Sequence, residues 1–162
     1  MKIGVLFDDF MKSDKNYHIM KTLNDQVKES NNEVCGFLVN VSGKVIDTTF
    51  AYSNITDISH FNDGLLVATS IQTADCLRKA AVGSDKIYYI WKMEWMGHPF
   101  RFYEVYDILS SSNLQIVVRS DLQKKVLQSN FNLSHIEVID DFNMEKLYEV
   151  RKREQRNNFK NA

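Results

Sequence analysis

Glycine and proline are scarce in this sequence, which has six glycines and one proline among 162 residues. So few turn-forming and helix-breaking residues argue against a fibrous or loop-rich chain. Hydrophobic residues make up 44% and charged residues 25%, which is ordinary for a globular protein. We therefore expect one domain over residues 1–150, followed by a basic helix end or tail over residues 151–162.

Cysteine is almost absent, and long hydrophobic runs are missing. Cys35 and Cys76 each lie in an apolar segment without a C-x-x-C motif. We expect them to be buried free thiols in a reducing compartment. No apolar run approaches the roughly 18 residues of a membrane span, and no signal-peptide core follows Met1. These features predict a cytoplasmic protein with no membrane partner.

An excess of charge of one sign is also lacking, because the formal net charge is −1. No overall field therefore favours nucleic acid or a membrane surface. The last twelve residues carry five basic side chains against one acidic, which leaves 15 basic and 20 acidic side chains elsewhere. We expect a solvated helix end there, with DNA binding by this tail as the alternative.

Several motifs of common enzymes are missing. The first apolar segment is followed by DDFMKSD, without G-x-G-x-x-G or G-x-x-x-x-G-K-[ST]. This disfavours the usual dinucleotide-binding and P-loop chemistries, and the lack of G-x-S-x-G disfavours an α/β-hydrolase. None of the four histidines has a partner at ligand spacing. We predict no metal site and no cofactor.

The sequence does contain a regular alternation of apolar strands and helices. Lys86–Trp91 has no polar alternation, which is typical of a strand buried on both faces. Other strands are expected at Ile3–Phe7, Glu33–Val39, Val45–Tyr52, Gly64–Ala68, Leu114–Val118 and Ile136–Ile139. Helix starts are expected at Asn16, Asp57, Ser70, Pro99, Ser120 or Asp121, and Asn143. The pattern predicts an α/β fold with a doubly wound, mostly parallel, Rossmann-like sheet of six to seven strands.

Polar side chains follow most of these strands. The carboxyl ends of parallel strands share one rim, where ligands bind. The candidate site residues on this rim are Asp8, Asp9, Thr69, Ser70, Glu94, Trp95, Arg119, Ser120, Asp141 and Asn143. Loops are polar in any such fold, so ordinary turns, caps and ion pairs are the structural alternative for each of them.

Glu94 is the most unusual of these residues because it lies between Trp91 and Trp95. Desolvation beside an indole raises the pKa of a carboxyl group and suits a general base. The tryptophans are candidate platforms for a sugar or a base, and an aromatic cluster that seals the sheet is the alternative. Asp8 and Asp9 are candidates for a metal-binding pair or for a general base, and a solvated loop before the helix is the alternative.

Two helix starts are candidate anion sites, because a helix N-terminus offers free backbone N–H groups. They are Thr69-Ser70 and Arg119-Ser120.

The strand ends also resemble those of the receiver domains of response regulators, which carry an acidic pair after the first strand, a Thr/Ser after a middle strand and a lysine after the next. Asp8-Asp9, Thr69-Ser70 and Lys92 would fit these positions. The phosphoacceptor aspartate after the third strand is missing, and no proline follows Lys92. We therefore disfavour that class.

Four segments, GLLVATS, KIYYIWKMEW, LQIVVRSD and VIDDFNMEKL, carry a more extensive resemblance. They resemble the second half of the N-terminal lobe of GT-B glycosyltransferases, in the style of the small glycosyltransferase-like proteins of T4-type bacteriophages. The start of the chain also fits such a lobe, whose first loop and helix face the acceptor. Lys92 stands where the related strand usually has an aspartate, and the donor-binding second lobe has no counterpart here.

The resemblance implies transfer of a sugar from a nucleotide-sugar to phage DNA bases or another acceptor. The missing lobe would come from a partner protein or a homodimer. Asp8, Asp9, Tyr17 and His18 would face the acceptor, Glu94 would be the base, and Arg119-Ser120 would lie near phosphate. The alternative is a non-catalytic nucleotide- or protein-binding phage accessory factor, used in anti-defence or host takeover. A phage protein of either kind would act in the host cytoplasm.

Overall fold

The computed structural model describes residues 1–11, 13–29, 32–40, 47–97 and 101–151. Seven strands form one sheet in the order β3-β2-β1-β4-β5-β6-β7, and all neighbouring pairs are parallel. The strands are β1 (Lys2–Phe7), β2 (Glu33–Leu38), β3 (Ala51–Asn54), β4 (Leu65–Ala68), β5 (Asp85–Ile90), β6 (Gln115–Val118) and β7 (Ile136–Val138). The prediction of a doubly wound, Rossmann-like parallel sheet is confirmed.

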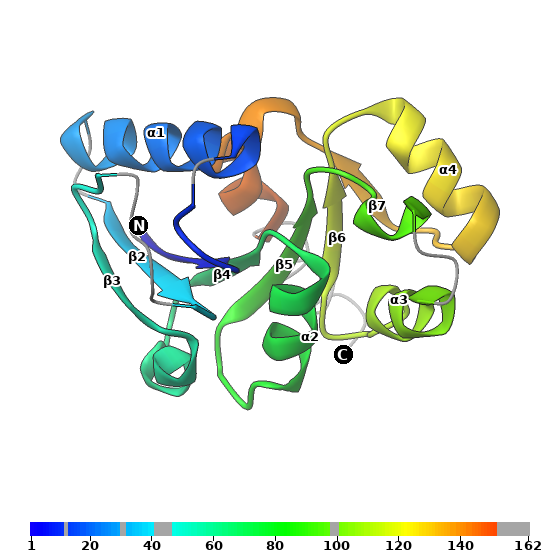
Figure 1. The fold of residues 1–162 in the computed structure, drawn as a ribbon, viewed down its shortest axis with the longest axis horizontal. Coiled ribbons are helices and arrows are strands. Elements are labelled where there is room, and N and C mark those ends of the chain that lie inside the picture. Colours follow the sequence, from blue (N-terminus) through cyan, green and yellow to red (C-terminus); the bar gives the residue numbers. More distant parts are fainter. Residues whose placement is uncertain (12, 30–31, 41–46, 98–100, 152–162) are drawn as a thin grey trace.

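Helices cover both faces of this sheet (Figure 1). The helices and 3₁₀ turns are α1 (Asp14–Glu29), η1 (Ile55–His60), α2 (Ile71–Lys79), η2 (Glu94–Gly97), α3 (Phe102–Leu109), α4 (Asp121–Phe131) and η4 (Asp140–Phe142). Residues 144–151 are also helical. One core lies between the sheet and α1 with residues 144–150, and the other lies against α2, α3 and α4.

β5 shows why its sequence lacks polar alternation. Ile87 and Tyr89 point into the core beneath α1, while Tyr88 and Ile90 point into the core beneath α2 and α3. All four side chains are buried. A strand between two helical layers requires apolar residues at every position.

The strand order reverses between β1 and β4, because the chain moves outward from β1 to β3 and returns on the other side of β1. In open parallel sheets, this reversal leaves a crevice at the carboxyl ends of the two central strands, which is the usual ligand position. The order also differs from the five-stranded 2-1-3-4-5 order of flavodoxin-like folds, the class to which receiver domains belong.

The third strand lies at the edge of the sheet, but the predicted range Val45–Tyr52 overlaps β3 only at Ala51 and Tyr52. β3 begins at Ala51, and residues 41–46 lie outside the described part of the chain. Asn24 of α1 provides the physical reason. Its Nδ2 donates to the carbonyl of Asp47 at 3.0 Å, and its Oδ1 accepts from the backbone N–H of Thr49 at 2.7 Å. A helix side chain therefore takes backbone groups that a strand would have used.

Some predicted helix starts also need correction. α1 begins at Asp14, and the buried Asn16 uses its Nδ2 to donate to the carbonyls of Asp9 and Met11. Asn16 therefore closes the loop after β1 and does not cap the helix. Pro99 lies outside the described residues, as do 152–162 of the predicted basic tail. Hydrogen bonds to helix N–H groups confirm caps at the side chains of Ser70, Ser120 and Asn143.

Candidate functional site

The carboxyl ends of the strands carry two groups of polar side chains. The first group lies at the reversal between β1 and β4, and we call it the switch-point cluster; it consists of Asp8, Lys15, Ser70 and Glu94. The second lies at the ends of β5, β6 and β7, and we call it the Arg119 cluster; it consists of His18, Trp91, Arg119 and Asp141. α1 contributes one residue to each cluster through Lys15 and His18.

Lys15 is the centre of the switch-point cluster. Its Nζ lies 3.6 Å from Asp8 Oδ2, 3.8 Å from Glu94 Oε1 and 3.2 Å from the carbonyl oxygen of Thr69. Ser70 Oγ donates to Asp8 Oδ1 at 2.5 Å. Two carboxylates from different strand ends therefore share one ammonium group, and the three charged groups carry a net charge of −1 when all are ionised.

Glu94 has an environment that raises its pKa. Burial is the largest cause, and the nearby Asp8 carboxylate acts in the same direction. Lys15 and the backbone N–H of Ile71, which donates to Glu94 Oε2 at 3.3 Å, both lower the pKa and offset only part of this effect. The Glu94 side chain is 35% exposed. A partly desolvated, solvent-accessible carboxyl with a raised pKa can exchange a proton with a bound group.

The raised pKa of Glu94 predicts a pH-dependent effect of Glu94→Gln. The folded protein holds a proton on Glu94 more tightly than the unfolded chain, whose value is 4.5. The stability that Glu94 contributes is therefore complete below pH 4.5 and is lost as pH rises through the folded pKa. In thermal melts we expect equal melting temperatures at pH 4 and a higher melting temperature for the variant than for wild type at pH 7.

Glu145→Gln is the matched control for this measurement, since Glu145 is exposed in the helix of residues 144–151. The control should follow the wild-type melting temperature across the pH range. If Glu94→Gln and wild type differ by the same amount at pH 4 and pH 7, the folded environment does not raise the pKa of Glu94.

Thr69 and Ser70 are buried and are used within the fold. Thr69 Oγ1 donates to the carbonyl of Leu6 at 2.7 Å, and Ser70 Oγ accepts from the backbone N–H of Thr73 at 3.1 Å. The Thr73 hydroxyl in turn accepts from the Ser70 N–H, which completes a capping box at the start of α2. Glu94 Oε2 accepts from the N–H of Ile71. A carboxylate of the protein therefore already occupies the start of α2, where the sequence predicted an external anion.

Arg119 lies on the face of the Trp91 indole, with its Cζ 3.8 Å from the ring centroid. Its Nη2 lies 3.7 Å from Asp141 Oδ1, and His18 Nε2 lies 3.9 Å from the same oxygen. Gln123 fixes the strand ends beneath them, since its Oε1 accepts from the Arg119 N–H and its Nε2 donates to the Trp91 carbonyl. The structure thus brings three predicted residues together, with His18 and Arg119 against the Trp91 ring and Asp141 beside both of them.

The other predicted site residues are placed less favourably. Trp95 is buried against Phe131, in the core opposite to Trp91, so it offers no stacking platform at the rim. Asp9 Oδ1 accepts from the N–H of Met11 and closes the loop after β1. Ser120 and Asn143 act as helix caps, and Tyr17 is exposed on α1.

The sequence reasoning missed Lys15, which links Asp8 and Glu94, and missed that Trp91 supports Arg119. A signal for Lys15 was present in its spacing. Residues three apart lie on one face of a helix, and Lys15 precedes His18 by three positions. If His18 faces the rim at the start of α1, then Lys15 does so as well.

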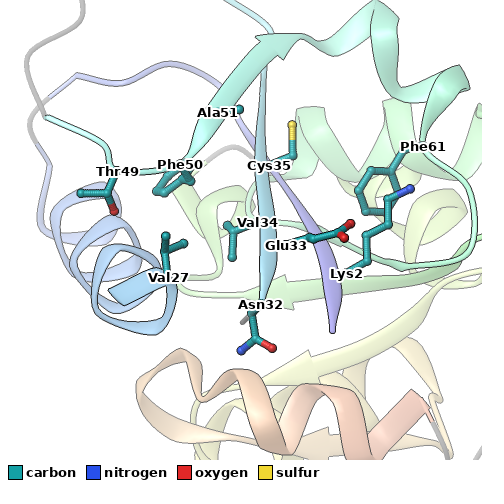
Figure 2. A pocket seen from close by; sticks show the side chains of 10 residues that line it. All are labelled: Lys2, Val27, Asn32, Glu33, Val34, Cys35, Thr49, Phe50, Ala51 and Phe61. Carbon is teal, nitrogen blue, oxygen red and sulfur yellow. The ribbon is translucent and has the colours of Figure 1, made fainter. Parts of the chain in front are cut away.

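A separate hollow of about 490 Å³ lies at the opposite, amino-terminal end of β2 (Figure 2). Its walls include Glu33, Cys35, Phe50 and Phe61. Lys2 also lines it, but its Nζ donates to the carbonyl of Asn62 and lies over the Phe61 ring. Burial raises the pKa of the half-buried Cys35 thiol, so this thiol is a weak nucleophile. The reactive groups of the hollow are therefore weaker candidates than those at the rim.

Among the residues that the structure describes, no three His, Cys, Asp or Glu side chains are grouped to hold a metal ion. None of the helices in that part of the chain is long and apolar enough to cross a membrane. Comparison with protein-family models and with curated proteins finds no match. The function must therefore be argued from the two clusters.

Proposed function

We propose that this chain is a glycosyltransferase-like lobe that binds an acceptor hydroxyl at the switch-point cluster and deprotonates it with Glu94. The donor would be a nucleotide-sugar shared with a second lobe. One observation carries this proposal. Glu94 is a partly exposed carboxyl with a raised pKa, beside Lys15 and Asp8 at the reversal of a parallel sheet.

The electrostatics suit a general base. A carboxylate with a raised pKa is a stronger base than an exposed glutamate, and a base is most effective when its pKa approaches the working pH. Lys15, 3.8 Å away, favours the ionised form of Glu94, which is the form that accepts a proton. When Glu94 takes the hydroxyl proton, Lys15 can turn fully to Asp8, which is 3.6 Å from its Nζ.

The charge of the cluster favours a neutral acceptor over a phosphate at this position. A phosphate at the start of α2 would have to displace Glu94 from the N–H of Ile71 and would face the Asp8 carboxylate. A sugar or base hydroxyl instead donates to a carboxylate and accepts from the Lys15 ammonium. This supports assigning the acceptor side to the switch-point cluster, as the family resemblance implies for Asp8.

A non-catalytic binding protein is the second candidate, because an aromatic surface on α3 is suited to a protein partner. Phe102, Tyr103 and Tyr106 are exposed on this helix, and Tyr103 is 84% exposed. Aromatic side chains are enriched in protein–protein interfaces. In that case Asp8, Lys15 and Glu94 would act as a structural ion cluster only.

A donor-consumption assay separates the two functions. Purified protein is incubated with nucleoside-diphosphate sugars and short DNA or sugar acceptors, alone and with candidate second-lobe proteins, and nucleoside diphosphate release is measured. Loss of a general base typically costs about 10²–10⁴-fold, so Glu94→Gln should reduce release at least 100-fold. Glu145→Gln is the control and should retain wild-type turnover.

Two results would contradict the glycosyl-transfer proposal. One is equal turnover by Glu94→Gln and wild type, which would remove Glu94 from the base role. The other is the absence both of turnover and of a thermal shift with every donor, since a ligand at 100 times its Kd stabilises the native state by roughly 2.7 kcal/mol. The second result would favour the binding protein.

A further inference from the structure

We infer that the Arg119 cluster is an oxyanion subsite for a phosphate or diphosphate group, and that Asp141 occupies the position of the anion in the free protein. The subsite is separate from Glu94 and does not depend on a catalytic role for it. Its parts come from α1, from the ends of β5 and β6, and from η4 after β7. The shared ligand chemistry is phosphate, whether free or attached to a nucleoside.

Arg119 is held in a fixed position with its charge directed to the rim. Stacking on the buried Trp91 ring stabilises a guanidinium by cation–π attraction. The hydrogen bond from its N–H to Gln123 Oε1, at 2.8 Å, holds the backbone. The Arg119 side chain is still 33% exposed. An arginine fixed before binding loses little conformational freedom when it takes up a phosphate.

Arg119 also has unused hydrogen-bonding capacity. Its Nε is buried and has no partner among the described residues. The contact of Nη2 with Asp141, at 3.7 Å, is longer than a charge-assisted hydrogen bond, for which the usual length is about 2.7–2.9 Å. Buried donors in native folds are usually paired, so this Nε is a polar group that the described part of the fold does not satisfy.

The position of Asp141 marks where an anion is stabilised. Its Oδ1 lies between two nitrogens, 3.7 Å from Arg119 Nη2 and 3.9 Å from His18 Nε2, and reaches neither at hydrogen-bond distance. A tetrahedral phosphate offers several oxygens to the same space and can contact both residues at once. Arginine binds phosphate through two parallel N–H donors, which one distant carboxylate oxygen does not use.

Asp141 can leave this position without unfolding its surroundings. Its side chain is 70% exposed, whereas the next residue, Phe142, is buried. The backbone N–H of Phe142 donates to the Tyr89 hydroxyl at 3.0 Å, which holds the turn in place. A rotation of the Asp141 side chain is therefore sufficient to open the space between Arg119 and His18.

This arrangement predicts effects of opposite sign for two charge-removing variants. Arg119→Ala should weaken binding of inorganic pyrophosphate at least tenfold, because the fixed cation is lost. Asp141→Asn should tighten it about tenfold, because the competing carboxylate is lost; tenfold corresponds to about 1.4 kcal/mol. Isothermal titration calorimetry at low salt measures both. A parallel titration with UDP distinguishes a nucleotide subsite, which binds UDP more tightly, from a subsite for free phosphate groups, which binds both equally.

Matched controls separate a local site from general electrostatics. Asp140→Asn removes the same charge from the neighbouring exposed residue and should leave the affinity within twofold of wild type. Arg101→Ala, at a partly exposed arginine paired with Glu104, should do the same. Circular dichroism and melting curves establish that every variant is folded. Pyrophosphate binding needs no turnover, so failure of the acceptor-base proposal and failure of this one can be told apart.

The inference is overturned by either of two outcomes. In the first, Asp141→Asn binds no better than Asp140→Asn, which makes Asp141 an ordinary ion-pair partner of Arg119. In the second, neither the wild type nor Asp141→Asn binds pyrophosphate at millimolar concentration. Binding by Asp141→Asn alone supports the inference, since it shows that the carboxylate excludes the anion from the free protein.

Discussion

A Gly4→Val variant is expected to lose about 3 kcal/mol or more of its unfolding free energy, since overpacking a well-filled core typically costs about 1–3 kcal/mol per small insertion. A Cβ atom on Gly4 would lie 2.6 Å from Leu66 Cδ2, 2.8 Å from Phe37 Cε2 and 3.3 Å from Phe61 Cε2. All three neighbours are buried and belong to one core. Two of these distances are shorter than real Cβ contacts, so the side chains of Leu66 and Phe37, or strand β1 itself, must shift.

Gly83→Val is the matched control, because a Cβ on Gly83 would meet nothing within 4 Å. Its stability should stay within about 0.5 kcal/mol of wild type, as for most exposed substitutions. Gly4→Ala should fall between the two, with a loss of about 1–3 kcal/mol. Urea unfolding followed by circular dichroism measures all three. A loss at Gly4 no larger than the loss at Gly83 would show that the core beneath α2 has room that the contact distances do not indicate.

The close approach at Gly4 also illustrates what the sequence could not reveal. The alternation of strands and helices, together with the continuous apolar run of β5, was sufficient to predict a parallel doubly wound sheet, because the two facing cores impose that pattern directly. The neighbours of Gly4 come from β2, β4 and the segment before β4. Such contacts depend on strand order and register, which a single sequence does not specify.

The rim was predictable in outline, since parallel strands end at one edge and ligands bind there. Which of its side chains meet was not predictable. Trp91 and Trp95 flank Glu94 in the sequence, but the chain turns through η2 and sends them into opposite cores. Glu94 then faces Lys15 and Ile71, which are far from it in sequence. The side chains that act together are set by the turns after the strands, and local sequence patterns specify these turns poorly.

The two clusters divide the rim by charge, and this division follows from the fold. The switch-point cluster joins two carboxylates to Lys15, whereas the Arg119 cluster joins Arg119 and His18 to the single exposed carboxylate of Asp141. A group-transfer lobe with a neutral acceptor on one side and a phosphate-bearing donor on the other needs this kind of separation. The two proposals are therefore compatible, although each has its own test.

A Tyr89→Phe variant should lose about 2–4 kcal/mol of unfolding free energy, because each buried backbone group left without a partner costs about 1–3 kcal/mol. The buried Tyr89 hydroxyl donates to the carbonyl of Ile139 at 2.9 Å and accepts from the N–H of Phe142 at 3.0 Å. Phenylalanine preserves the edge-to-face contact with the Phe142 ring, whose centroid is 5.0 Å away. The substitution therefore removes the two hydrogen bonds and little else.

The pKa of Tyr89 supports this role for its hydroxyl. Burial is the main cause that raises the pKa from 10.0 to about 12, so the group remains a donor to Ile139 at neutral pH. The folded state holds this proton more tightly than the unfolded chain. The stability that the protonated Tyr89 hydroxyl contributes to the folded state is complete below pH 10 and is lost as pH approaches 12. Tyr89→Phe should reduce the alkaline loss of stability over this range.

Tyr103→Phe is the control for the Tyr89 substitution. Tyr103 is 84% exposed, so its substitution should change stability by less than about 0.5 kcal/mol.

The Tyr89 hydroxyl also bears on function through the turn of η4, where Asp141 and Phe142 both have positive φ, at 54° and 49°. Positive φ is unfavourable for residues with a side chain, so this turn needs an external restraint. Tyr89 provides it through the Phe142 N–H.

Loss of that restraint should free the Asp141 carboxylate from its position between Arg119 and His18. We therefore expect Tyr89→Phe, measured at a temperature where it remains folded, to bind pyrophosphate more tightly than wild type and closer to Asp141→Asn. A stability equal to that of Tyr103→Phe would show that the Tyr89 hydroxyl does not hold the turn. Lower stability with unchanged pyrophosphate affinity would show that the turn keeps Asp141 in place without Tyr89.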